Sequence, residues 1–208
     1  MSIRTLPHLL IALMTLLFTM STPHAGEAKN TADNENQSIV LAGGCFWCIE
    51  SDYEKLDGII SVVSGYSGGQ LKNPTYKQVS AGNSGHIEVV EVTYDPRIIT
   101  RDKILDFFWH HIDPTRDDGQ FCDNGPQYRP AIFYKDEAEK QAIIKSAQLI
   151  EKNKPFKESL KVEFIPASTF YPAEEYHQDY YKKNSLRYNY YRFSCGRDAR
   201  IEELWGVE

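Results

Sequence analysis

Residues 39–50 have the sequence IVLAGGCFWCIE, in which an apolar run is followed by two glycines and then by a segment with helical spacing. This pattern predicts a strand over 39–42, a tight turn, and a helix from 45 to about 56 that ends before Gly58. Cys45 then lies in the first turn of the helix, beside unpaired backbone N–H groups and the positive end of the helix dipole. Because that position favours the thiolate over the thiol, we predict that Cys45 is a nucleophile.

The residues after Cys45 supply an apolar surface and a second thiol. Phe46 and Trp47 place two aromatic rings beside the predicted nucleophile, and Cys48 completes a C-x-x-C spacing that is typical of redox pairs. Together these features indicate a site for sulfur chemistry. A disulfide oxidoreductase of the thioredoxin type, using Cys45 and Cys48, is an alternative enzyme, although the elements that follow do not have a thioredoxin-type order.

Apolar periodicity along the rest of the chain predicts an α+β fold. The other core elements are expected at 59–66, 86–94 and 130–134 as strands and at about 101–111 as a helix. With the first strand and helix, the order is β-α-β-β-α-β, the split βαβ or ferredoxin-like arrangement, in which helices cover a sheet in two layers. A C-terminal helix, an extra strand and a long aromatic tail that packs against the domain are expected at about 136–151, 161–165 and 187–197.

Two long segments, 67–85 and 113–127, separate these elements and are rich in glycine and polar residues. We expect both to be loops without regular structure. Loops of this length are unusual in a compact domain and are more often functional. Tyrosines and polar groups occur in both, so their ends are candidates to approach Cys45.

The first 25 residues differ in composition from the rest of the chain. Arg4 is followed by an apolar stretch over 9–18 and then by small and polar residues up to Ala25, which is the pattern of a secretory signal. The apolar stretch, about ten residues, is short for a membrane span, so a tethered protein is the minor alternative. We therefore expect export to the periplasm, with a signal peptide at 1–25, a flexible leader at 26–37 and one folded domain at 38–208.

The whole chain of 208 residues is 41% hydrophobic and has a formal net charge of −6, as expected for one globular domain with short additions. An acidic chain without a basic block argues against nucleic acid as a partner. Four cysteines, at 45, 48, 122 and 195, follow the predicted signal. Four cysteines in an exported protein usually form two structural disulfides, so a non-catalytic crosslinked domain is a further alternative. We expect a monomer.

Glu88 is the candidate for a proton donor. In the predicted strand over 86–94, alternation places Glu88 on the same face as Val90 and Val92. A carboxyl on such an apolar face has a raised pKa because burial disfavours its charged form, and it then stays protonated near neutral pH and acts as a general acid. The alternative is an exposed glutamate on an edge strand.

Other polar residues have both structural and functional interpretations. Asp123 precedes an Asn-Gly pair, so it is either a turn-forming residue or a member of the site. Tyr76 and Tyr128 are two of 13 tyrosines, and any one tyrosine more often packs than catalyses. For His177 and Asp179, which lie in a polar pattern, we expect a surface or supporting role.

The sequence does not favour a metal centre. Only Cys45 and Cys48 have the spacing of a zinc ligand pair, and no second close pair accompanies them. No glycine-rich phosphate motif and no serine nucleophile elbow occurs in the required context. We expect the chain to work without a cofactor.

Eight short motifs in register resemble the class A peptide methionine sulfoxide reductases. The resemblance runs from about residue 38 to 181, most of the chain after the predicted signal. One four-residue match is weak, but eight in order are highly specific. They are GCFW at 44–47, GYSGG at 65–69, NPTY at 73–76, GHIE at 85–88, YDP at 94–96, HIDP at 111–114, QYR at 127–129 and YHQ at 176–178.

The resemblance implies a reaction. Cys45 is expected to attack the sulfoxide sulfur of an oxidised methionine, free or within a protein, and Glu88 to protonate the sulfoxide oxygen. Members of the family act on the S epimer at sulfur. The first products are then methionine and a sulfenic acid on Cys45.

The resemblance also implies supporting roles around the reacting atoms. Tyr76 and Tyr128 are expected to assist the acid through hydrogen bonds. Phe46 and Trp47 are expected to form the apolar wall that receives the S-methyl group of the substrate. Asp123 matches an acidic position that organises the site.

A second thiol is then expected to attack the sulfenic acid, and a thioredoxin-like donor to reduce the resulting disulfide. Many relatives have glycine where this chain has Cys48 and carry the recycling cysteine in a mobile glycine-rich tail. Cys48 needs no movement of the tail, Cys195 is followed by the flexible Gly196, and Cys122 adjoins a candidate site residue. The resolving cysteine is left open among these three.

Overall fold

The structure, a computed structural model, describes Met1 and residues 35–206. Apart from Met1, the predicted signal peptide and the leader up to residue 34 lie outside the described residues. Among the described helices, none is both long enough and apolar enough to cross a membrane. Gln37, the last residue of the predicted leader, is instead the first residue of strand β1 (Gln37–Ala42), where it pairs with Tyr94.

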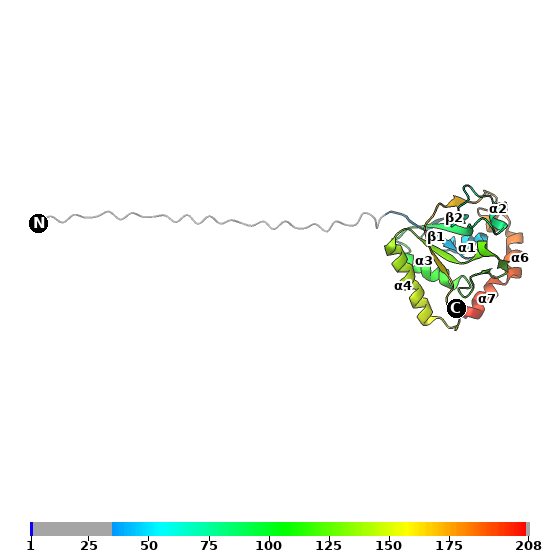
Figure 1. The fold of residues 1–208 in the computed structure, drawn as a ribbon. Helices are drawn as coiled ribbons and strands as arrows, with labels where there is room; N and C mark the ends of the chain where they lie inside the picture. The colour runs from blue at the N-terminus through cyan, green and yellow to red at the C-terminus, as the bar shows by residue number, and fades with distance from the viewer. Residues whose placement is uncertain (2–34, 207–208) are drawn as a thin grey trace. The chain divides into compact units, whose positions relative to one another are not determined.

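Six strands form the central sheet (Figure 1). Besides β1 they are β2 (Ile59–Ser67), β3 (Ile87–Tyr94), β6 (Ala131–Tyr134), β7 (Glu163–Pro166) and β8 (Tyr171–Pro172). Their order is β7-β6-β1-β3-β2-β8. The four middle strands are antiparallel to one another, β8 is antiparallel to β2, and β7 is parallel to β6. This is the strand order of the βαββαβ arrangement, so the predicted core is confirmed.

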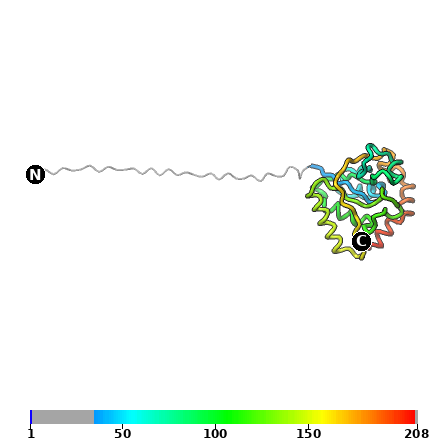
Figure 2. The backbone as a smooth tube through the Cα atoms, in the orientation of Figure 1, coloured from blue at the N-terminus to red at the C-terminus, as the bar shows by residue number. Residues whose placement is uncertain are grey.

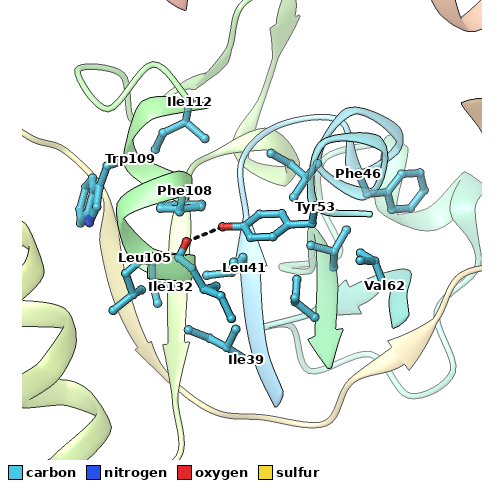
Figure 3. Packing of buried hydrophobic residues seen from close by; sticks show 14 of the residues in the cluster. Ile39, Leu41, Phe46, Tyr53, Val62, Leu105, Phe108, Trp109, Ile112 and Ile132 are labelled. Carbon is cyan, nitrogen blue, oxygen red and sulfur yellow. Dashed lines mark hydrogen bonds between the residues drawn. The ribbon is translucent and has the colours of Figure 1, made fainter. Parts of the chain in front are cut away.

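Helices α1 (Phe46–Tyr53) and α3 (Arg101–His110) pack on one face of the sheet and enclose the main hydrophobic core (Figure 3). Alternation along the strands sends side chains such as Leu41 of β1 into this core. The hydroxyl of Tyr53 in α1 donates a 2.8 Å hydrogen bond to the carbonyl of Ile104 in α3. Because α1 begins directly after β1, the core also fixes the turn between them.

Both segments predicted to be unstructured contain short regular elements, so that part of the prediction is wrong. The segment 67–85 holds helix α2 (Tyr76–Ser80), whose first turn is stabilised by a capping box. The segment 113–127 leads through β4 (Gly119–Gln120) and β5 (Asp123–Asn124) into the 3-10 helix η2 (Pro126–Tyr128). Elements this short have no detectable apolar period.

After β6 the chain is mainly helical, with β7 and β8 between the first of these helices and the others (Figure 2). Helix α4 lies close to its predicted place, and the predicted aromatic tail is helical. The helices are α4 (Glu137–Asn153), α5 (Tyr180–Lys183), α6 (Ser185–Cys195) and α7 (Arg197–Trp205). The buried guanidinium of Arg197 donates hydrogen bonds to the carbonyls of Gly43 (3.2 Å) and His111 (2.8 Å). The tail is therefore packed against the turn before Cys45, as expected.

Candidate active site

Cys45 lies where the strand-turn-helix pattern predicts it, at the N-cap of α1. Gly44 before it has a φ of +87°, and a Cβ at this position would lie 2.6 Å from the Cβ of Gln120, so the turn requires glycine. Cys45 is 7% exposed and packs in the main core. The thiol is thus held by the turn between β1 and α1 rather than by a flexible loop.

The predicted effect of this position on the Cys45 thiol is wrong in sign. Burial raises the pKa of Cys45 well above that of a free thiol, and the hydrogen bond with Cys48 and the charges of Glu88 and Asp123 raise it further. Burial is the largest of these effects, and it acts against the dipole at the helix start. The surroundings of Cys45 therefore favour its thiol form over the thiolate.

Cys48 lies one turn further along α1, and its pKa is shifted in the opposite direction. Its backbone N–H donates a 3.1 Å hydrogen bond to the carbonyl of Cys45. The hydrogen bond from the Cys45 thiol lowers the pKa of Cys48, and the charges of Arg197 and Arg192 lower it further, against the effect of burial. Both thiols are free. The two arginines thus favour a thiolate at Cys48.

Glu88 is buried on the central strand β3, on the core face that Val90 and Val92 also share, as predicted. Its Oε2 accepts a 3.2 Å hydrogen bond from the backbone N–H of Phe46. Burial raises the pKa of Glu88 to about 8, opposed by this hydrogen bond and aided by the charge of Asp123. The carboxyl is therefore mostly protonated at neutral pH and available as an acid. The alternative of an exposed edge glutamate is wrong.

A cavity of about 60 Å³ joins these groups. It is lined by two chemically active groups and a ring of aromatic and polar side chains: Cys45, Glu88, Phe46, Trp47, Tyr76, Asp123, Tyr128 and Tyr191. Tyr76 begins α2 and Tyr128 ends η2, so both of the predicted loop regions reach Cys45. The cavity is small, in keeping with a site for a small group.

Tyr76 and Tyr128, two of the three tyrosines that line the cavity, are hydrogen-bond donors at neutral pH. Burial raises the pKa of Tyr76 to about 12, and the charges of Glu88 and Cys45 contribute. Burial also raises the pKa of Tyr128, with Glu88 again contributing. Both hydroxyls therefore remain protonated beside the buried acid.

The indole of Trp47 is fixed by residues of the C-terminal part. It stacks on Tyr180 with ring centroids 3.7 Å apart and planes 5° apart, and its N–H donates a 3.1 Å hydrogen bond to Nδ1 of His177. His177 is buried, and burial lowers its pKa, in keeping with a neutral ring that accepts this bond. The backbone N–H of Asp179 donates to Glu50 in α1. The supporting role expected for this segment is confirmed, and a surface position for His177 is wrong.

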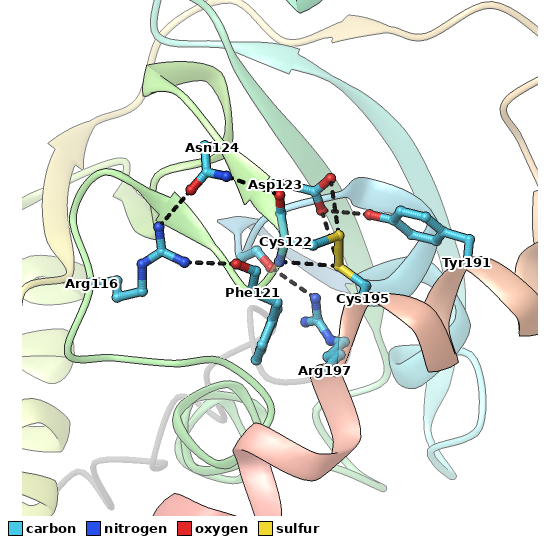
Figure 4. The surroundings of a disulfide bond; sticks show 9 residues. Arg116, Phe121, Cys122, Asp123, Asn124, Tyr191, Cys195 and Arg197 are labelled. Carbon is cyan, nitrogen blue, oxygen red and sulfur yellow. Dashed lines mark hydrogen bonds between the residues drawn. A yellow bond between two sulfur atoms is a disulfide. The ribbon is translucent and has the colours of Figure 1, made fainter.

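A disulfide joins Cys122 to Cys195 beside the cavity residue Asp123 (Figure 4). Cys45 and Cys48 stay free, so the alternative of two structural disulfides is wrong. The bond also pairs two of the three candidates for the resolving cysteine with each other. Among the described residues, Cys122, Asp123 and Cys195 form the one group with the geometry of metal ligands, and its sulfurs are bonded to each other.

Tyr191 is a site residue that the sequence pattern does not single out. Its hydroxyl donates a 2.5 Å hydrogen bond to Asp123, and its side chain lines the cavity. Glu174 was missed as well, and its Oε1 accepts a 2.9 Å hydrogen bond from the backbone N–H of Tyr76, which anchors α2. Tyr191 precedes Cys195 by one helical turn, so the two residues share a helix face. A single sequence does not indicate which other part of the protein that face packs against, so Tyr191 could not be predicted as a site residue.

The family model described as peptide methionine sulfoxide reductase matches residues 37–208. The chain belongs to the peptide methionine sulfoxide reductase family. Peptide methionine sulfoxide reductase MsrA of Halalkalibacterium halodurans is 49% identical over 170 residues, which are 82% of this chain and 97% of that relative. Peptide methionine sulfoxide reductase MsrA/MsrB of Vibrio cholerae is 51% identical over 96% of this chain, which spans about half of that longer relative, 52% of its length.

Solved structures of this reductase family have the same fold. Reduced Mxr1 from Saccharomyces cerevisiae has a TM-score of 0.68 and 33% identity, over 73% of this chain and 87% of that chain. Mxr1 in complex with Trx2 has a TM-score of 0.51 and 26% identity, over 70% of this chain and 85% of that chain. The predicted resemblance and the α+β fold are confirmed. The thioredoxin-type oxidoreductase and the non-catalytic domain are wrong.

A larger cavity of this reductase lies away from Cys45. It has a volume of about 490 Å³ and is lined by residues in and next to α1, α3, α6 and α7, among them Phe107, His110 and Trp205. No thiol lines it. The small cavity is therefore the candidate active site.

Proposed function

We propose that this chain reduces the S epimer of methionine sulfoxide, free or within proteins, to methionine, with Cys45 as the nucleophile. The observation that carries the proposal is the 60 Å³ cavity, where a buried thiol, a protonated carboxyl and an aromatic wall face the same small space. A methyl sulfoxide needs a nucleophile at sulfur, an acid at oxygen and an apolar surface for its methyl group. The family name supplies the substrate class.

In the first step the sulfur of Cys45 attacks the sulfoxide sulfur while Glu88 protonates the sulfoxide oxygen. Tyr76 and Tyr128 donate hydrogen bonds that assist this transfer. The sulfur–oxygen bond of the substrate breaks, the oxygen passes to Cys45, and methionine leaves as the thioether. Cys45 is oxidised to a sulfenic acid as the sulfoxide is reduced. The thiol proton of Cys45 replaces the proton that Glu88 gives, so the step is balanced without an outside proton.

The preference for one epimer follows from the two unlike sides of the cavity. A methionine sulfoxide sulfur carries a methyl group, an oxygen and the rest of the substrate chain. When the methyl group contacts Phe46 and Trp47 and the oxygen meets Glu88, the chain points out of the cavity in one epimer only. The resemblance to the class A enzymes implies that this is the S epimer.

Cys48 is the proposed resolving thiol. Its sulfur attacks the sulfenic acid of Cys45, which forms a disulfide and releases water. Cys48 is free, lies one turn along α1 and has a lowered pKa, whereas Cys122 and Cys195 are bonded to each other. A thioredoxin-like dithiol then reduces the disulfide and is itself oxidised, in line with the complex of Mxr1 with Trx2.

The proposed setting is outside the cytoplasm, where the enzyme repairs oxidised exported proteins. The signal pattern in residues 1–25 supports this setting. The Cys122–Cys195 disulfide also fits an oxidising compartment.

Variants of the two reacting groups test the proposed function in a single turnover. We expect no methionine from Cys45→Ser, because an alcohol cannot accept the sulfoxide oxygen in this way. Glu88→Gln keeps a hydrogen-bond donor but cannot give a proton, so its rate should fall roughly 100-fold or more. The control Cys48→Ser should still form one methionine per enzyme but no disulfide with Cys45. Methionine formation by Cys45→Ser at the wild-type rate contradicts the proposal.

A further inference from the structure

Asp123 is held by groups of helix α6 and by the disulfide (Figure 4). Its Oδ2 accepts a 2.5 Å hydrogen bond from the hydroxyl of Tyr191, and the same oxygen lies 4.0 Å from Sγ of Cys195. Its Oδ1 lies 3.9 Å from Sγ of Cys122. The carboxylate thus lies between a tyrosine of α6 and the bond that ties α6 to the loop carrying Asp123.

One face of α6 is directed at the active site. Tyr191 and Cys195 are four residues apart in this helix, so they lie on the same side, and both contact Asp123. The ring of Tyr191 also meets Trp47 edge-on, with centroids 5.9 Å apart. The neighbouring Tyr190 is 74% exposed. Tyr191 is therefore the residue through which α6 contacts both Asp123 and the aromatic wall.

The loop that carries Asp123 has little regular structure of its own. Strands β4 and β5 pair over two residues each. Arg116 donates hydrogen bonds to the carbonyl of Phe121 and to the side chain of Asn124. The disulfide adds a covalent bridge between segments 73 residues apart in sequence. Loss of that bridge leaves the Asp123–Tyr191 contact to weaker, non-covalent interactions.

We propose that Tyr191 is a positioning residue of the reductase that holds Asp123 in the wall of the Cys45 cavity, and that the Cys122–Cys195 disulfide keeps Tyr191 in place. This inference rests on the proposed function of the same cavity. The disulfide is then a structural part of the active site and not an electron carrier. In agreement, Asp123 and Tyr191 line the cavity, whereas neither sulfur of the disulfide does.

A double-mutant cycle between Tyr191→Phe and Asp123→Asn tests whether Tyr191 holds Asp123 in place. Single-turnover rates with the S epimer are measured on the full protein without added reductant, with Tyr190→Phe as the control on the exposed side of α6. Each variant should slow methionine formation roughly tenfold, because a hydrogen bond to a charged group is lost. The double variant should be about as slow as either single one, because both remove the same contact. Tyr190→Phe should match wild type.

The disulfide is tested with Cys122→Ser/Cys195→Ser, which keeps Cys45 and Cys48. Its single-turnover rate should also fall roughly tenfold, and adding Tyr191→Phe should slow it little further. Turnover driven by thioredoxin should fall by the same factor. A single-turnover rate equal to wild type with loss of thioredoxin-driven turnover makes the disulfide an electron carrier and overturns the proposal.

Two other results also overturn it: a Tyr191→Phe variant with the wild-type rate, or effects of Tyr191→Phe and Asp123→Asn that multiply in the double variant. Failure of the proposed function is a separate outcome. In that case the wild-type protein itself forms no methionine from the S epimer, and the variants are not needed to detect it.

Discussion

Glu88 is mostly protonated at neutral pH because the effects that raise its pKa outweigh the one that lowers it. Burial raises its pKa to about 8 and the charge of Asp123 contributes, while the backbone N–H of Phe46 favours the carboxylate. Alternation along the strand was enough to predict its face. The burial that sets its pKa depends on α1 and on the loop of Asp123, which come from distant parts of the sequence.

The pKa of Glu88 can be observed directly by infrared spectroscopy. The carboxylic acid band that is present in wild type and absent in Glu88→Gln should disappear as the pH rises through about 8. The Glu88→Gln spectrum has to be subtracted because a second buried glutamate titrates nearby: burial also raises the pKa of Glu50, to about 7. In Asp123→Asn a negative charge is removed, so the Glu88 band should disappear at a lower pH. A Glu88 titration near its ordinary value of 4.5 contradicts the assignment of Glu88 as the acid.

At the scale of elements, the turn between β1 and α1 fixes the thiol in the core. Gly43-Gly44 and the apolar strand before them indicate this turn from sequence alone. Its tight fit does not follow from sequence, because Gln120, which excludes a Cβ at Gly44, lies in the second loop region. The same holds for α2 and η2, which are too short to show a period yet bring Tyr76 and Tyr128 to the cavity.

Two glycine variants separate backbone strain from the close contact. Gly44 and Gly196 both have positive φ, but only at Gly44 does an added Cβ meet another atom within 4 Å. Gly196→Ala should lower the free energy of unfolding by about 1 kcal/mol, from backbone strain alone. Gly44→Ala should lower it by about 3 kcal/mol, because overpacking adds to the strain, and it should slow methionine formation. Equal losses in urea unfolding contradict a tight turn at Gly44.

At the scale of the whole molecule, local patterns were sufficient for the core and insufficient for the site. The strand order follows from the order of elements, and the motifs indicate Cys45, Glu88 and the aromatic wall. The Cys122–Cys195 disulfide and the position of Tyr191 depend on how the C-terminal helices pack against the rest of the domain. Apolar periodicity within a segment does not predict that packing. The sign of the Cys45 pKa shift was missed for the same reason, since burial by several elements acts against the dipole at the helix start.

The most direct test of the account is a single turnover of the wild-type protein with resolved S and R methionine sulfoxide, followed by mapping of the disulfides. Without added reductant, we predict about one methionine per enzyme from the S epimer and none from the R epimer, with the two free thiols, Cys45 and Cys48, lost. The new disulfide should join Cys45 to Cys48, and the Cys122–Cys195 bond should remain. Methionine from the R epimer, or no methionine from either, contradicts the account.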